Sequence, residues 1–237
     1  MRCRLCGTPT GKFLSQYHSS CAAEFKKQWT LMGQAIDEYN AGVTSFAVAK
    51  DRLIRASAES NVQRFFWSNI YSRNELRTYD KLIYSQNFIC ASEEKNRCHM
   101  ERTGLSYAKY PQWEQSTHSI CQNGTIALTD SGVYILGGGA ATIYIPYSKI
   151  VDVGFEDSRW FGPSAYFDVK TTSPKRHRYS VMALDRKFKN IAISVYDILR
   201  FMVGLKAQEP KNHLSNTPPD PIDYIFELCP KETTAQP

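Results

Sequence analysis

Hydrophobic residues recur with a helical period near the start of the chain. Between residues 25 and 36 they stand three or four positions apart, and Lys26 and Lys27 fall between them. Side chains with this spacing share one face of a helix, so residues 25–36 are predicted to form an amphipathic helix with its charged side turned outward. The apolar positions of this face are Phe25, Trp29, Met32 and Ile36.

The next stretch lacks the residues that usually interrupt regular structure. Asn40-Ala41-Gly42 ends the first helix, and no glycine or proline follows until Gly104. Residues 46–58 and 61–70 have helical patterns, so we predict a mostly helical connector over residues 31–118. Its aromatic side chains are interpreted as core, with a ligand groove as the alternative.

From Gly124 onward the pattern becomes that of β-strands. Runs of β-branched and aromatic residues alternate with turn residues, and Asp130-Ser131-Gly132 has the composition of a hairpin turn. A broad apolar stripe over residues 185–205 then predicts a helix. The pattern therefore predicts an antiparallel sheet followed by one amphipathic helix. The predicted strands are residues 125–129, 133–136, 142–146, 150–155, 166–171 and 178–183.

Composition is that of a globular protein with room for two modules. The chain has 237 residues, of which 42% are hydrophobic. No apolar leader follows Met1, and the weakly polar residues 133–146 are too few and too glycine-rich to cross a bilayer. Seven cysteines, an odd number, favour thiols and metal ligands over a disulfide framework. We therefore expect a cytoplasmic protein, with peripheral membrane association as an alternative.

Four potential metal ligands stand close together at the N-terminus. Cys3-x-x-Cys6-Gly7 and His18-x-x-Cys21 form two pairs, each with two intervening residues, and the second pair begins a predicted helix. Such spacing lets two side chains of one tight turn reach the same ion. Four bound ligands would close a tetrahedral zinc shell, which is typical of structural rather than catalytic sites. The alternative is a set of buried thiols with a surface histidine.

A second set of such residues is less compact. Cys90, Cys98-His99 and His118-x-x-Cys121 contain the donors of another site, but only the last pair has ligand spacing. We interpret them as buried thiols and surface histidines, with a second metal site as the alternative.

The net charge of +6 is unevenly placed. Residues 170–189 hold seven lysines and arginines and one acid, an excess that could meet phosphate groups or form an ordinary solvated face. Aromatic residues in the neighbouring loop could add an anchor for a membrane or a protein. The candidate ligand-binding residues are Lys170, Lys175, Arg176, Arg178, Trp160 and Phe161.

Residues 124–158 carry a resemblance to a known family. They read GTIALTDSGVYILGGGAATIYIPYSKIVDVGFEDS. This resembles the pattern of GRAM and bacterial PH-like domains, in which a strand and a glycine-rich tip precede I-P-Y-x-K-I-V. The residues Thr129-Asp130-Ser131-Gly132 depart from the family's T-N-K-R/H at that turn. The N-terminal ligand pattern resembles a treble-clef zinc finger, and the whole chain is similar to bacterial and phage-borne proteins that join such a finger to a PH-like domain.

The resemblance implies an α+β fold in which a helix caps a bent antiparallel sheet. We expect a treble-clef zinc finger in residues 1–30, the helical connector in 31–118, the PH-like domain in 119–206 and an extended proline-rich tail in 207–237. A PH-like scaffold offers a groove and charged loops, so we expect binding without catalysis.

The leading functional hypothesis is a non-enzymatic adaptor stabilised by structural zinc. Its partner would be a protein or an anionic membrane surface, and no small-molecule substrate is inferred. The alternative is nucleic-acid binding through a basic finger. A metal hydrolase built on His99 and His118 is disfavoured, because no HExxH or similar spacing accompanies them. The basic residues of the finger are Arg2, Arg4, Lys12, Lys26 and Lys27.

Overall fold

The structure is a computed structural model of the chain. It describes residues 3, 8–11, 18–60, 79–102, 109–137, 142–158, 162–171, 177–183 and 189–205. In these parts the chain forms helices and one antiparallel sheet, which is an α+β fold as predicted. No helix in these parts has both the length and the apolar character needed to cross a membrane.

Two helices form an antiparallel pair near the N-terminus. Helix α1 spans Ser19–Asn40 and α2 spans Phe46–Glu59. Gly42 lies in the turn between them with φ +75°, a left-handed conformation that suits glycine. Ser45 then caps α2, because its side-chain oxygen accepts a hydrogen bond from the Val48 amide. The helices predicted over residues 25–36 and 46–58 are thus confirmed.

The strands form one seven-stranded sheet in the order β4-β3-β2-β1-β7-β6-β5. Every pairing between the described strands is antiparallel, and β1, the first strand of the chain, pairs with β7, the last. The 3-10 turn Tyr147–Lys149 separates β4 from β5. The strands are β1 Leu82–Arg102, β2 Lys109–Thr129, β3 Gly132–Leu136, β4 Ile143–Pro146, β5 Ile150–Ser158, β6 Gly162–Val169 and β7 His177–Ala183.

Most of the sequence prediction for the C-terminal half is confirmed. The turn at Asp130 to Gly132 joins β2 to β3, and the remaining predicted strands overlap β4 to β7. Helix α4, Lys189–Val203, lies within the predicted range and packs on β5, β6 and β7. Its buried residues include Val195, with Ile198 and Leu199 three and four positions further on.

The helical connector predicted over residues 31–118 is wrong in its second half. Residues 82–102 belong to β1, and residues 109–118 belong to β2. The absence of glycine and proline between Gly42 and Gly104 is typical of a long helix, but an unbroken strand such as β1 lacks them too. The helix predicted over 61–70 lies outside the described residues, as does the tail from residue 207.

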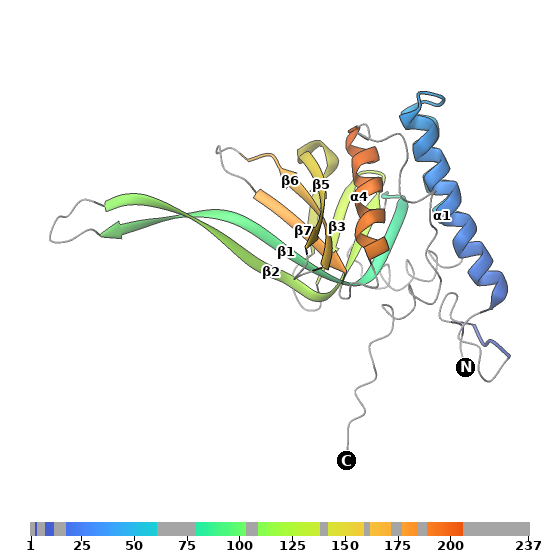
Figure 1. Ribbon diagram of the computed structural model, residues 1–237, viewed down its shortest axis with the longest axis horizontal. Coiled ribbons are helices and arrows are strands. Elements are labelled where there is room, and N and C mark those ends of the chain that lie inside the picture. Colours follow the sequence, from blue (N-terminus) through green and yellow to red (C-terminus); the bar gives the residue numbers. More distant parts are fainter. Residues whose placement is uncertain are drawn as a thin grey trace, which may run out of the picture.

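The helix pair and the sheet share one hydrophobic core. Phe201 of α4 contacts the rings of Tyr39 and Phe46, at centroid distances of 5.2 and 5.0 Å. Near the middle of α1, the Trp29 ring meets Tyr84 of β1 edge-on, with ring centroids 6.0 Å apart. A continuous cluster of buried side chains joins these groups. In the view of Figure 1, α1 lies to one side of α4 and of the strands.

The two longest strands extend beyond the rest of the sheet. Strand β7 pairs with β1 from Ile89 to Lys95, whereas β1 and β2 stay paired as far as Arg102 and Lys109. Residues 96–102 and 109–115 therefore form a two-stranded ribbon, which we call the arm. Figure 1 shows the arm projecting away from the other strands.

Candidate metal centre and charged network

The start of α1 positions two of the predicted metal ligands. His18 is the N-cap residue, with extended backbone angles, and Cys21 lies in the first helical turn. A helix N-terminus favours negative charge, so it stabilises a thiolate at Cys21. The third candidate ligand, Cys3, donates a hydrogen bond of 2.6 Å from its amide to the Thr8 carbonyl.

These three residues could hold one metal ion. Their ligand atoms all lie within 4.8 Å of one another. Cys21 Sγ is 3.6 Å from His18 Nδ1. A tetrahedral zinc ion with bonds of about 2.3 Å to sulfur and about 2.0 Å to nitrogen would separate such atoms by about 3.5 Å. The observed separation fits two ligands of one such ion, and it is also a hydrogen-bond distance between the two groups.

The other ring nitrogen of His18 is fixed by the backbone. Nε2 lies 3.0 Å from the Pro9 carbonyl oxygen, which can only accept, so Nε2 carries the proton and donates it. Nδ1 is then available as a metal ligand. Histidine ligands commonly donate their second N–H to a carbonyl in this way, which sets the ring's orientation.

The site is mostly closed to water. Cys3 and Cys21 are both buried and belong to the core cluster that contains Phe25, while His18 is half-buried. Such a location suits a structural ion, since the ligands tie the N-terminal segment to the base of α1. Cys6, the predicted fourth ligand, lies outside the described residues.

The second set of cysteines and histidines is not gathered in the same way. Cys121 is buried opposite Ala91, and its thiol lies 3.9 Å from the Ile89 carbonyl. Burial raises the pKa of both the Cys90 and the Cys121 thiols, which disfavours the thiolate that a metal needs. His118 Nε2 is 3.0 Å from Ser116 Oγ. Within the described residues, these groups do not converge as Cys3, His18 and Cys21 do.

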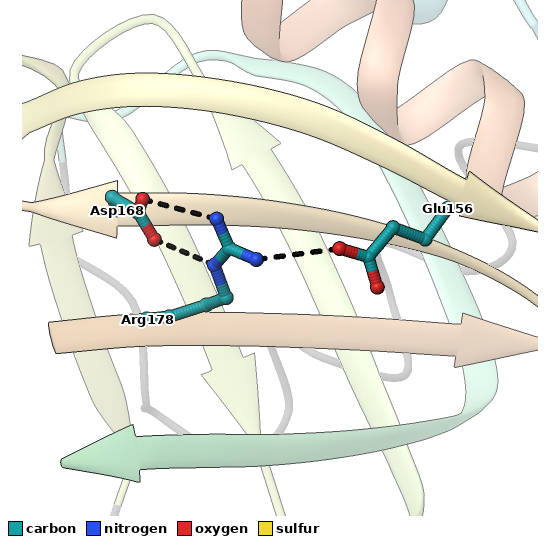
Figure 2. A network of polar contacts seen from close by, with 3 residues as sticks. All are labelled: Glu156, Asp168 and Arg178. Carbon is teal, nitrogen blue, oxygen red and sulfur yellow. Dashed lines mark hydrogen bonds and ion pairs between the residues drawn. The ribbon is translucent and has the colours of Figure 1, made fainter. Parts of the chain in front are cut away.

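Arg178 is not the surface cation that the sequence suggested. Figure 2 shows its guanidinium between Asp168 and Glu156. Nε and Nη2 lie 2.7 and 3.1 Å from the two carboxylate oxygens of Asp168, and Nη1 lies 3.4 Å from Glu156. The side chain is only 7% exposed, and its Cζ atom is 3.4 Å from the centroid of the Tyr166 ring. Arg178 is thus an internal partner of two acids, and its role in binding an external ligand stays a prediction.

The remaining candidate ligand-binding residues differ in whether the structure describes them. Lys170 is exposed just after β6. His177, the neighbour of Arg178, directs Nε2 to Glu93 on β1 at 2.7 Å. The rest of the set, Lys175, Arg176, Trp160 and Phe161, lies outside the described residues.

Sequence reasoning missed the acidic residues that hold this network. Asp168 had a detectable signal, because folding the chain symmetrically about Ser173 places Asp168 opposite Arg178, as the structure does. Glu93 had none, since its partners His177 and Tyr179 are more than 80 residues away. The role of the Pro9 carbonyl beside His18 could not be predicted from the sequence either, because it is a backbone group.

Comparisons with known proteins leave the family open. No family model matches the chain, and no curated protein matches it. A chain from the structure of "The 8S snRNP Assembly Intermediate" aligns with 54% of this chain and 86% of its own length. That alignment has a TM-score of 0.37 and 11% sequence identity, values too low to support a shared fold or function.

Proposed function

We propose that this chain is a non-enzymatic adaptor, stabilised by a structural zinc ion, whose PH-like sheet recruits a protein partner. The observation that carries the metal part is the convergence of Cys3, His18 and Cys21 with the Pro9 carbonyl behind the histidine. Cys6 is the proposed fourth ligand. The ion would supply binding energy that orders the N-terminal segment, where few apolar groups are available.

Zinc content tests this part directly. The purified chain should contain about one zinc per molecule, and Cys21→Ser should lose most of it. The midpoint of thermal unfolding should fall by about 10 °C or more in the variant. Cys90→Ser removes a thiol outside the site and should keep the metal. A parent protein without zinc, or a Cys21→Ser variant that retains it fully, would contradict the proposal.

The strand order supports a PH-like scaffold. The first four strands form a meander, the last three form another, and β1 and β7 join them, while α4 packs on the second group. A sheet with one packed helix leaves strand edges and connecting loops available for partners. Such scaffolds bind through those surfaces, so the PH-like proposal favours a binding protein.

A protein partner is favoured over a membrane because the basic surface is smaller than the sequence suggested. Arg178 already pairs with Asp168 and Glu156, so it contributes little charge outside. Each exposed lysine or arginine adds about 1 kcal/mol to binding at an anionic membrane, so the loss of one weakens a small patch noticeably.

Two experiments separate these partners. Site-specific photo-crosslinkers at Trp160 and Phe161 in cells should capture a discrete protein. A crosslinker at Val43, which is 74% exposed in the turn between α1 and α2, should not. Flotation with anionic vesicles should give no binding at physiological salt. Flotation that is abolished by Lys170→Glu with Lys175→Glu and Arg176→Glu would replace the protein partner with a membrane.

Nucleic-acid binding is the second candidate. Lys26 and Lys27 are exposed on α1, within two helical turns of the metal ligand Cys21. They could contact phosphates, while Cys21 and Phe25 on the same helix remain buried. A gel shift that Lys26→Glu with Lys27→Glu abolishes would support this candidate, and a parent protein that shifts neither DNA nor RNA would remove it.

A further inference from the structure

No described strand covers either edge of the arm, because β3 pairs with β2 only from Thr125 to Leu128. The edge on the β1 side continues the edge that β7 covers. Strand β7 occupies this edge of β1 from Ile89 to Lys95 and begins at His177, opposite Lys95. Residues 96–102 continue β1 with β2 on one side only. Seven residues of strand extend about 23 Å, so the uncovered edge is long enough for a full additional strand.

An isolated two-stranded ribbon is marginally stable in water, and an uncovered edge is a template for further pairing. Natural proteins usually protect such edges or use them to bind an extended segment. The arm extends well past the sheet in Figure 1, so no neighbouring strand of the sheet supports it there. A third strand on the arm would satisfy its open backbone groups.

The two edges of the arm differ. The β2 side contains Pro111, which pairs with Met100 and has no N–H to offer. Proline is a common protection of an edge strand, since it removes a donor from the row. Residues 96–102 of β1 contain neither proline nor glycine. The β1 edge is therefore the one suited to pairing.

The sequence of this edge is complementary to itself. If two copies pair antiparallel with His99 at the centre, Arg97 of one copy stands opposite Glu101 of the other, and the same contact occurs twice. Cys98 then faces Met100. Opposite charges directly across an antiparallel pair are stabilising, and two-fold symmetry gives every contact twice.

We propose that a second copy of this chain docks on residues 96–102, so that two arms join into a four-stranded sheet around a two-fold axis near His99. The paired stretch has natural limits. Residue 96 faces residue 102 of the other copy, where β1 ends, and β7 already occupies the edge at Lys95. The inference concerns the arm alone, so it stands apart from the zinc and partner proposals.

The predicted dimer is a weak one, because an interface of one strand pair buries little surface. Sedimentation velocity at concentrations up to about 200 μM should therefore show a concentration-dependent monomer–dimer equilibrium. Glu101→Arg places arginines opposite each other and should shift the apparent Kd by about tenfold or more. Glu59→Arg, on the exposed surface of α2, makes the same change of charge and should leave the Kd unchanged.

A mixing experiment distinguishes the charge pairing from a folding defect. Arg97→Glu has two glutamates at positions 97 and 101, and Glu101→Arg has two arginines, so each variant alone should be mainly monomeric. Mixed, they should form a heterodimer at least as tight as the parent, because each glutamate then faces an arginine. Arg97 lies opposite Glu114 in the β1–β2 register and Glu101 lies opposite the uncharged Tyr110, so Glu101→Arg is the cleaner single variant.

Two results would overturn the proposal. One is a parent protein that is monomeric at the highest concentration, which would assign the edge to a different chain. The other is a dimer whose Kd does not respond to Glu101→Arg and whose variants do not combine on mixing. That result would place the dimer interface elsewhere on the molecule.

Discussion

Arg178 is held by three side chains on two neighbouring strands. Asp168 and Tyr166 belong to β6, and Glu156 belongs to β5. The contact with Asp168 is bidentate, which is a strong form of ion pair. Glu156 is 59% exposed and contacts the guanidinium at 3.4 Å, so solvent screens it. The two acids should therefore differ in their contribution to stability.

We predict that Arg178→Ala lowers the free energy of unfolding by about 3 kcal/mol, since it removes the bidentate cationic partner of the mostly buried Asp168 carboxylate. Glu156→Gln should change it by less than about 0.5 kcal/mol. Urea unfolding of the two variants checks both values. Equal effects would contradict the ranking. Arg55→Ala, which removes an exposed pair with Asp51, is a matched control and should have little effect.

Ionisation of Tyr179 makes the stability of the fold depend on pH. Burial raises its pKa, as does the hydrogen bond of 2.8 Å that its hydroxyl donates to Glu93. The folded state then keeps a proton that the unfolded chain loses near pH 10. The contribution of Tyr179 to the free energy of unfolding is therefore fully present below about pH 10. It falls as the pH rises above that value, by at most about 1.4 kcal/mol per pH unit.

Tyr179→Phe should reduce that slope, which urea unfolding between pH 9 and 11 measures. Some slope should remain, because burial also raises the pKa of Tyr147. Lysines titrate in the same range in both proteins, so the difference between parent and variant isolates Tyr179. A variant with the slope of the parent would show that Tyr179 titrates alike in the folded and unfolded states.

At the scale of elements, strands β5 and β6 fit together because Gly154 of β5 leaves room for the ring of Tyr166 in β6. Gly154 pairs with Tyr166, and a Cβ on Gly154 would lie 2.1 Å from the ring carbon Cζ. The ring can move only by giving up its contact with Arg178. The fit of these two strands thus depends on the absence of a side chain at one position.

We predict that Gly154→Ala lowers stability by about 1–3 kcal/mol in the parent. In a Tyr166→Ala background the same change should be neutral or slightly stabilising, because the clash is gone. A double-mutant cycle by urea unfolding checks this coupling. Additive effects would mean that the ring does not limit the site. Backbone strain does not complicate the interpretation of Gly154→Ala, since the φ of Gly154 lies outside the left-handed range.

The elements that could be predicted from sequence are those whose partners lie close along the chain. The hairpin at Asp130 to Gly132 has its own turn signal, and β6 and β7 pair symmetrically about Ser173. Cys3, His18 and Cys21 were found because ligand spacing is itself local. Strand β1 was missed even though its partner β2 follows it directly, because its other partner, β7, lies more than 80 residues further along the chain.

For the whole molecule, the continuous core predicts a single cooperative unfolding transition. Phe201 joins the helix pair to the sheet and is 1% exposed. Phe201→Ala should cost about 3–5 kcal/mol and raise amide exchange rates in α1 and α2 more than in β5 to β7. Hydrogen exchange read by mass spectrometry measures this. Uniform acceleration in helices and sheet would mean that the helix pair does not open separately.

Val43→Ala serves as the control for this variant. Val43 is 74% exposed in the turn between α1 and α2, so its truncation should change stability by less than about 0.5 kcal/mol. Exchange in the helices should then match the parent.

The pairing of β1 with β7 also bears on how the chain is made. The ribosome releases β1 long before residues 177–183, at about 5–20 residues per second, so the nascent chain holds its central strand half-paired for several seconds. The sheet cannot be completed by its N-terminal half, however stable the helix pair is. Completion waits for β7, so a chain that stopped near residue 170 would lack the strand that connects β1 to β6.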